Sequence, residues 1–297
     1  MTNKTICVVG PTASGKTAIS IEIAKCFNGE IISGDSIQVY QELNIGSAKI
    51  TKQEMNGIPH HMIDIKSCFE GFSAGEFSEL TKQKISDISS RGKTPIIVGG
   101  TGLFIKGLIE GYDFSLCPRN EEFRNACNDV IKSEGLEKLY QELKRLNPCR
   151  ASEISPNDQK RIIRALEIEK FSNTPPNKQP TTKDFVVVGL SLPREKLYER
   201  INERVDKMVE NGLVEEVRAL YEKGLNENFQ SMKGIGYKEL FPYFRGESSL
   251  EECINLIKQH SRNFAKRQMT WFGSMPYIKW FEPSQKKEIF DYIRSEL

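Results

Sequence analysis

The chain has 297 residues, of which 38% are hydrophobic and 28% charged, and its formal net charge is only +2. This composition is that of an ordinary globular protein with enough apolar residues for a core, and the near balance of charge gives no global signature of a nucleic-acid-binding protein. No apolar stretch approaches the ~18 residues of a membrane span, no secretory leader is evident, and the seven cysteines contain no C-x-x-C pair. We therefore expect a cytoplasmic protein with reduced thiols and no membrane contact.

The first predicted elements are a strand, a glycine-rich loop and a helix. Thr5–Val9 is a short apolar, β-branched run typical of a buried strand, and Ile19, Ile23 and Phe27 recur at about helical spacing. Between them, residues 10–17 read GPTASGKT and fit the phosphate-loop pattern G-x-x-x-x-G-K-[ST] at every fixed position.

Such a loop brings backbone N–H groups and the positive end of a helix onto one anion. Lys16 is expected to reach the outer phosphate, and the Thr17 hydroxyl to hold Mg²⁺. The alternative is a glycine turn that binds nothing, which the matched strand and helix disfavour. The predicted di- or triphosphate site consists of Gly10, Pro11, Thr12, Ala13, Ser14, Gly15, Lys16 and Thr17. The loop alone does not distinguish ATP, GTP and a prenyl diphosphate.

Further along the chain, strand-like runs alternate with helical patterns and then give way to helices alone. Strands are expected at 30–33, 61–65, 95–98 and 185–190, and helices at 121–133, 136–146 and 158–171, with a linker at 172–184. This order predicts an α/β fold with a P-loop NTPase-like parallel sheet core, residues 1–112 and 184–297, whose C-terminal part is helical. Residues 113–183 are predicted to form an inserted all-helical subdomain.

Two more strand ends carry residues suited to chemistry, because ligands of parallel sheets collect at the carboxyl ends of the strands. Asp35 follows the strand at 30–33 and could accept a proton from a nucleophile or hold Mg²⁺ through water. Its alternative role is a helix cap or turn residue. The segment Gly99–Gly102 follows the strand at 95–98 and includes Thr101. It either lets a ligand approach the backbone closely or simply forms the turn into the next helix.

Near the C-terminus, Lys258, Arg262 and Lys266 share one face of a predicted helix. No acidic residue occurs between Glu252 and Glu282, so we expect an unneutralised basic face, suited to a diphosphate or an RNA backbone. A merely solvated face is the alternative.

Two further groups of side chains are expected to have no site chemistry. The adjacent His60 and His61 would point to opposite faces of a strand, so we reject a zinc site. The aromatic residues after the basic helix could stack on bases, but packing against the core is favoured. They are Trp271, Phe272, Tyr277 and Trp280.

Eight segments occur in one order along the whole chain: 10–17, 35–40 (DSIQVY), 59–64 (PHHMID), 72–77 (FSAGEF), 99–104 (GGTGLF), 157–167, 234–237 (GIGY) and 265–272. Together they resemble the bacterial-type tRNA dimethylallyltransferases, also called tRNA isopentenyltransferases. The resemblance implies transfer of a dimethylallyl group from dimethylallyl diphosphate to the exocyclic N6 amine of the adenosine 3′ to the anticodon. It also implies Asp35 as general base, Thr101 and Lys16 as further catalytic residues, and Mg²⁺ at Thr17.

The resemblance further implies that the inserted helices grip the tRNA anticodon stem-loop. The tRNA contacts it assigns are Asp35, Ser36, Ile37, Gln38, Thr101, Arg124, Gln159, Lys160, Arg161, Ile162 and Ile163. The chain departs from the family at Gly273, where many relatives have an arginine, and at Lys233, which keeps the charge of a frequent arginine without its bidentate geometry. We expect a monomer.

Three other functions are compatible with a phosphate loop. A nucleotide or nucleoside kinase combines such a core with a helical lid, but the predicted insert is long for a lid. An adenylate isopentenyltransferase prenylates free AMP, ADP or ATP, and the large basic insert favours tRNA over a free nucleotide. A non-enzymatic RNA-binding switch protein would turn over ATP or GTP without prenyl transfer.

Overall fold

The structure is a computed structural model that describes residues 4–114, 117, 119–172 and 180–297. Its contacts divide the chain into two compact units, Met1–Glu110 with Thr181–Leu297, and Gly111–Pro180. The second unit begins at Gly111 rather than at 113 and ends at Pro180 rather than at 183. Most of the linker expected at 172–184 lies outside the described residues. None of the helices in the described ranges has the length and hydropathy that a bilayer crossing requires.

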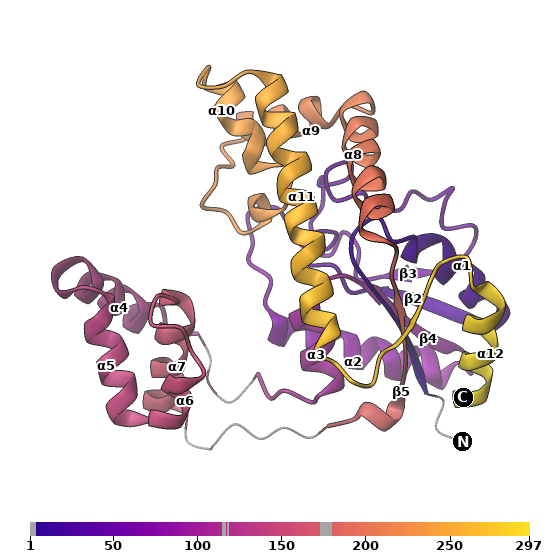
Figure 1. The fold of residues 1–297 in the computed structure, drawn as a ribbon, viewed down its shortest axis with the longest axis horizontal. Helices are drawn as coiled ribbons and strands as arrows, with labels where there is room; N and C mark the ends of the chain where they lie inside the picture. Colours follow the sequence, from indigo (N-terminus) through magenta and orange to yellow (C-terminus); the bar gives the residue numbers. More distant parts are fainter. Residues whose placement is uncertain (1–3, 115–116, 118, 173–179) are drawn as a thin grey trace. The chain divides into compact units, whose positions relative to one another are not determined.

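In the described part of the first unit, a six-stranded sheet has the order β3-β2-β4-β1-β5-β6, and every pairing is parallel (Figure 1). The strands are β1 (Thr5–Val9), β2 (Gly29–Ser33), β3 (His60–His61), β4 (Thr94–Gly99), β5 (Phe185–Leu190) and β6 (Lys279–Phe281). The central strand β1 aligns Cys7 with Ile97 and Val187. Parallel strands of this kind are covered on both faces, which explains their nearly continuous apolar runs. The predicted α/β fold is confirmed.

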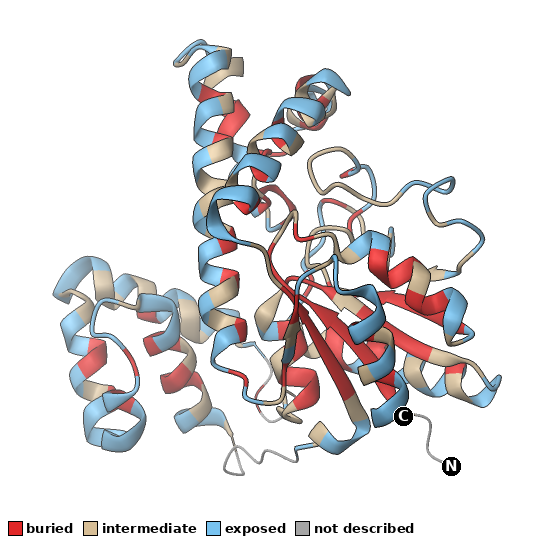
Figure 2. Cartoon of the chain, turned by 45° about the vertical axis from the view of Figure 1, so that its right-hand side comes forward, coloured by how far each residue is buried: buried red, intermediate tan, exposed pale blue. Residues whose placement is uncertain are grey.

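Helices cover both faces of this sheet. The first unit contains the helices α1 (Lys16–Cys26), α2 (Ala74–Ser90), α3 (Gly102–Ile109), α8 (Arg194–Glu210), α9 (Leu213–Glu222), α10 (Phe241–Phe244), α11 (Leu250–Gly273) and α12 (Lys286–Glu296), with short 3₁₀ turns η1 (Thr182–Asp184), η2 (Ser231–Lys233) and η3 (Lys238–Leu240). Alternate side chains of β1 enter two separate cores. Ile6 and Val8 pack with α1 and α12, whereas Cys7 and Val9 pack with α2, α3 and the C-terminal helices. Figure 2 shows the strands buried between these layers.

The longest of these helices, α11, has a sharp beginning because Ser249 and Glu252 form a reciprocal capping box. The aromatic residues at its end pack as expected: Phe272 is fully buried, and Trp271, Tyr277 and Trp280 are partly buried against the core. In Figure 1 this helix extends from α10 at one end to α3 at the other.

One strand prediction was wrong, and one strand was missed. The strand expected at 61–65 is limited to β3, because Met62 and Asp64 adopt left-handed backbone angles, with φ of 63° and 56°. Extended pairing cannot continue through two such residues. The edge strand β6 was missed, since three residues carry too little periodicity to be recognised.

The second unit contains α4 (Glu121–Glu134), α5 (Leu136–Leu146), α6 (Pro148–Ser152) and α7 (Gln159–Phe171). Leu143, Ile162 and Leu166 are fully buried in a core of its own. The fully buried Glu167 accepts hydrogen bonds from Arg124, Arg164 and the Asn120 N–H. These bonds tie α4 to α7 and give this unit a polar as well as an apolar anchor.

Candidate active site

A cavity of about 1020 Å³ lies in the first unit, at the carboxyl ends of β1, β2 and β4. Its size suits a small-molecule or cofactor site. The phosphate loop, Asp35 and Thr101 line it, as do Arg204 of α8 and Lys233 of η2. The topology thus brings together the three strand ends that the sequence singled out.

The phosphate loop has a backbone that its glycines make possible. A Cβ on Gly10 would lie 2.4 Å from the Leu190 carbonyl oxygen, and Gly15 precedes α1 in a left-handed conformation with φ of 90°. The Lys16 ammonium donates to the carbonyl oxygens of Gly10 at 3.0 Å and Pro11 at 2.7 Å. The Ser14 hydroxyl is buried with no hydrogen-bond partner among the described residues. The loop therefore has one unpartnered hydroxyl and one ammonium that is bonded only to backbone carbonyls.

Burial, and to a smaller extent the nearby Arg204, lower the pKa of Lys16 to about 7 against the opposing effect of Asp35. Burial also lowers the pKa of Arg204, against the opposing effect of Asp35. Arg204 makes no hydrogen bond or ion pair with the described residues. Two desolvated cations thus lie near one carboxylate without an ion pair to it, which favours binding of a polyanion in this cavity.

Asp35 both faces the cavity and caps a turn. Its Oδ1 accepts the N–H groups of Ile37 at 2.8 Å and Gln38 at 3.3 Å, whereas Oδ2 has no partner in the described part of the chain. The turn role that the sequence offered as an alternative is present, and it fixes the carboxylate while leaving one oxygen for a ligand.

The hydroxyl of Thr101 joins the ends of β4 and β2. It accepts the Ser36 N–H at 3.1 Å and lies 3.3 Å from the Ser36 hydroxyl. A Cβ on Gly99 would lie 2.3 Å from the Gly34 carbonyl oxygen, so glycine is needed for the two strand ends to approach. The segment Gly99–Gly102 therefore leads into α3 and also lets the backbone at Gly99 approach that at Gly34 closely.

One site residue that the sequence analysis gave no role is Gln268 of α11. Its Oε1 accepts the Thr12 N–H at 2.8 Å, and its Nε2 donates to the Gly100 carbonyl at 2.9 Å. Its side chain is almost completely buried. Gln268 therefore ties the phosphate loop to the end of β4. Arg204 was missed as well, because no motif distinguishes it from its charged neighbours on α8.

The basic face of α11 is neutralised in part, contrary to expectation. Lys258 pairs with Asp206 of α8 at 2.6 Å, and Arg262 donates to Asn202 on the same helix. Arg267 lines the cavity with its guanidinium over the Phe264 ring. The acidic partner lies on a neighbouring helix, where a search along α11 alone could not find it.

The two adjacent histidines have separate partners. Nδ1 of His60 lies 2.8 Å from the Ile58 carbonyl oxygen, and Nε2 of His61 lies 2.8 Å from a Glu30 carboxylate oxygen. His60 lines the cavity, whereas His61 belongs to the buried cluster around Glu30.

The second unit exposes only some of the side chains expected to contact tRNA. Gln159, Lys160 and Arg161 are exposed at the start of α7. The side chains of Ile162 and Ile163 lie in the core of the unit, so a tRNA contact at these two positions would have to use their backbone. The sixth residue, Arg124, is bound through two nitrogens to Glu167 and keeps 26% of its side chain exposed.

Comparisons with known proteins give one consistent result. The family model described as IPP transferase matches residues 38–275. The tRNA dimethylallyltransferase of Bacillus pumilus is 47% identical, with 98% of this chain and 96% of that protein covered. The solved tRNA isopentenylpyrophosphate transferase of Bacillus halodurans is 42% identical, with a TM-score of 0.75 and coverage of 99% and 96%. A eukaryotic dimethylallyltransferase acting on tRNA, 29% identical, gives a TM-score of 0.79 with coverage of 99% and 80%.

Proposed function

Because this chain belongs to the IPP transferase family, we propose that it transfers a dimethylallyl group from dimethylallyl diphosphate to the N6 amine of the adenosine 3′ to a tRNA anticodon. Diphosphate is the leaving group. The observation that carries this proposal is one cavity in which a phosphate loop and two desolvated cations face a carboxylate with a free oxygen. A leaving diphosphate and a proton acceptor both have a place there.

The cations serve the leaving group. As the allylic C–O bond breaks, negative charge accumulates on the diphosphate, and donors already in place stabilise it. The N–H groups of the phosphate loop, Lys16 and Arg204 supply these donors. Lys16 has only to exchange its bonds to Gly10 and Pro11 for bonds to the ligand.

The residues present fit a Mg²⁺ ion held together with the diphosphate. No group of three His, Cys, Asp or Glu side chains in the described ranges could hold a metal by itself. Mg²⁺ commonly keeps several waters and binds phosphate oxygens with one or two protein oxygens. The Thr17 hydroxyl, exposed in the cavity on the first turn of α1, is the protein ligand that we propose. When bound, the ion would supply further neutralisation of diphosphate charge.

Asp35 serves the acceptor. The adenine amine is a weak nucleophile, so its proton must leave as the new C–N bond forms. We assign that proton to the Asp35 oxygen that the turn does not use. The target base has to leave its stack to enter the cavity, where Ser36 and Gln38 can contact its edge and Thr101 the reacting groups.

A transfer assay with unmodified tRNA, dimethylallyl diphosphate and Mg²⁺ tests the proposal, with mass spectrometry of the digested nucleosides as readout. We expect a dimethylallyl mass gain on the adenosine beside the anticodon. Asp35→Asn keeps an oxygen for the turn but loses the base, so it should lower kcat about 10²–10⁴-fold. Asp291→Asn, on the exposed face of α12, is the matched control.

Other outcomes would identify a different enzyme. Product with free AMP but none with tRNA would mean an adenylate isopentenyltransferase. ATP turnover without prenyl transfer to either acceptor would refute the proposal and favour a kinase or a switch protein.

A further inference from the structure

The segment that follows Asp35 has almost no regular structure, yet it forms one wall of the cavity. Residues 38–49, here named the acceptor loop, contain turns and one isolated bridge, between Tyr40 and Lys66. Gln38, Gly46, Ser47 and Ala48 of this loop line the cavity. Because no helix or sheet fixes the loop, other interactions must determine where these residues lie.

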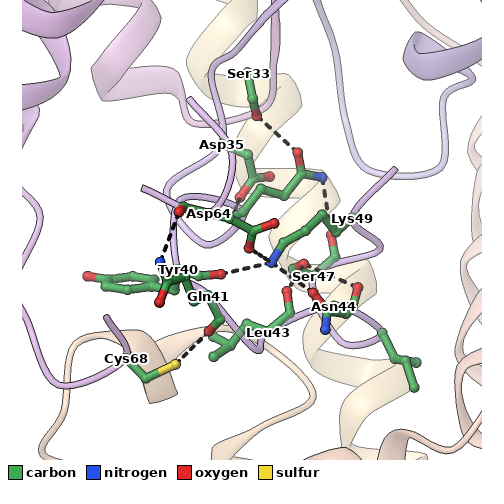
Figure 3. A network of polar contacts seen from close by, with 12 residues as sticks. Ser33, Asp35, Tyr40, Gln41, Leu43, Asn44, Ser47, Lys49, Asp64 and Cys68 are labelled. Atoms are coloured by element: carbon green, nitrogen blue, oxygen red, sulfur yellow. Dashed lines mark hydrogen bonds and ion pairs between the residues drawn. The ribbon is translucent and has the colours of Figure 1, made fainter. Parts of the chain in front are cut away.

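Within the loop, the side chain of Gln38 has a defined orientation. Its Nε2 donates to the carbonyl oxygens of Ser47 and Ala48, both at 3.3 Å, and its Oε1 accepts the Ser33 hydroxyl at 2.9 Å. Figure 3 labels two of these partners, Ser33 and Ser47. The amide of Gln38 therefore follows the carbonyls of residues 47 and 48 if the loop moves.

Lys49 holds the loop from inside. Its side chain is only 6% exposed, and its ammonium contacts the Tyr40 carbonyl at 2.8 Å, Asn44 Oδ1 at 3.0 Å and Asp64 Oδ1 at 2.5 Å (Figure 3). The Ser47 hydroxyl adds a bond to the Leu43 carbonyl. These contacts hold the acceptor loop together and connect it to Asp64, but they do not attach it to α9.

Glu216 of α9 makes that attachment. Its carboxylate accepts three consecutive N–H groups, those of Asn44 at 3.0 Å, Ile45 at 2.8 Å and Gly46 at 3.1 Å. It also accepts the Tyr237 hydroxyl at 3.0 Å. Successive N–H groups that converge on one anion form a specific and directional site.

Tyr237 is the second residue that holds the acceptor loop, and we call Glu216 and Tyr237 together the clamp. It is fully buried, and burial together with Glu216 raises its pKa well above the ordinary value, so the phenol remains a donor. A Cβ on Gly46 would lie 2.6 Å from the Tyr237 ring, so the loop lies directly against the aromatic face. Neither Glu216 nor Tyr237 lines the cavity.

We propose that Glu216 and Tyr237 are positioning residues for the acceptor base: they fix the acceptor loop and, through its carbonyls, the amide of Gln38. The inference rests on the proposed function. Since the clamp is separate from the phosphate loop, its loss should impair use of tRNA and leave binding of dimethylallyl diphosphate intact. A residue that served only general stability would not make that distinction.

The main test is Glu216→Gln, assayed for transfer to tRNA and for binding of dimethylallyl diphosphate by calorimetry. The glutamine amide keeps one oxygen acceptor but turns an NH₂ donor either toward the Gly46 N–H or toward the N–H groups of Asn44 and Ile45, so we expect kcat/KM for tRNA to fall about 10–100-fold. The Kd of dimethylallyl diphosphate should change less than about twofold. Glu215→Gln, on the exposed side of the same helix turn, is the matched control and should behave as wild type.

Two more variants exclude a purely structural explanation. Tyr237→Phe keeps the ring against Gly46 and removes one hydrogen bond, so it should show a smaller loss of about threefold or more with the same substrate dependence. It also serves if Glu216→Gln does not fold. Because the clamp acts through Gln38, the double variant Gln38→Ala with Glu216→Gln should lose little more than the worse single variant.

The outcomes separate the inference from the function on which it rests. A wild-type protein that transfers nothing to tRNA overturns the proposed function. An active wild type with unchanged tRNA kinetics in both clamp variants, an equal loss for both substrates, or additive effects with Gln38→Ala overturns this inference alone.

Discussion

The ammonium group of Lys16 lies where burial lowers its pKa to about 7, and Arg204 acts in the same direction against Asp35. In the free protein this lysine therefore loses its charge as the pH rises through about 7. A bound diphosphate favours the charged form, so binding above pH 7 must take up a proton. We predict that diphosphate affinity falls between pH 7 and 9, by at most about tenfold per pH unit.

Calorimetry with inorganic diphosphate, in buffers of different ionisation heat, measures both the affinity and the proton uptake. Lys16→Arg stays charged throughout this range, so its pH profile reports the titration of the ligand alone. The prediction fails if wild type and Lys16→Arg show the same slope.

Gln268 illustrates how one buried amide that lines the cavity can connect two parts of a site. It accepts from Thr12 and donates to Gly100, and its replacement by leucine would leave both backbone groups unpaired. We predict that Gln268→Leu weakens diphosphate binding about 10-fold, as measured by calorimetry. Gln259→Leu, exposed on the same helix, should bind as wild type. Equal affinities in the two variants would contradict a role for this link.

At the scale of elements, the local sequence pattern predicted the helices and the central strands better than the edge strands of the sheet. The expected helix at 136–146 coincides with α5, because its apolar residues recur with helical period and Asn147 ends it. The expected strand at 61–65 failed, because an alternating apolar pattern also suits a loop with two left-handed residues. A two-residue edge strand depends on its neighbour, which local sequence does not show.

The site was predictable where it is formed by motifs and not where it is formed by packing. Asp35 and Thr101 follow strands within one sheet, so their meeting follows from topology. Arg204 and Glu216 lie on amphipathic helices rich in charge, and only the packing of α8 beside the cavity and of α9 against the acceptor loop distinguishes them from solvated residues. A contact between residues on two helices far apart in the sequence leaves no periodic pattern in the sequence from which it could be predicted.

Glu167 is the polar anchor between α4 and α7. Burial raises its pKa, but Arg124, the Asn120 N–H and Arg164 outweigh that effect and hold the pKa at about 2. Its loss would leave guanidinium groups without their partner. We predict that Glu167→Gln destabilises these helices by about 3 kcal/mol, measured by urea unfolding with hydrogen exchange of α4–α7.

The exposed Glu122→Gln on α4 is the control for that variant and should leave stability unchanged. Because the folded pKa of Glu167 is lower than the unfolded one, its contribution is present above about pH 4.5 and is lost as the pH falls toward 2. A Glu167→Gln protein with wild-type stability at pH 7 would refute the anchor.

At the scale of the whole molecule, the first unit does not need the second one to complete its sheet or its cavity. All strands of the described sheet and the whole cavity belong to the first unit, although its chain is interrupted between Glu110 and Thr181. The two sides of the interruption meet, because Thr181 donates its N–H to the Ile109 carbonyl at 3.0 Å. The core can therefore close without the insert.

Deletion of the second unit tests separately the binding of diphosphate and the use of tRNA. With residues 111–180 replaced by a Gly/Ser linker of about four residues, the core should fold, since loop exchange at adjacent ends costs little. Calorimetry should give a diphosphate Kd within about threefold of wild type, because Lys16 and Arg204 are retained. If the exposed start of α7 contacts tRNA, as the family resemblance implies, kcat/KM for tRNA should fall at least about 100-fold. Unchanged tRNA kinetics in a variant that binds diphosphate normally would show that the core alone recognises the tRNA.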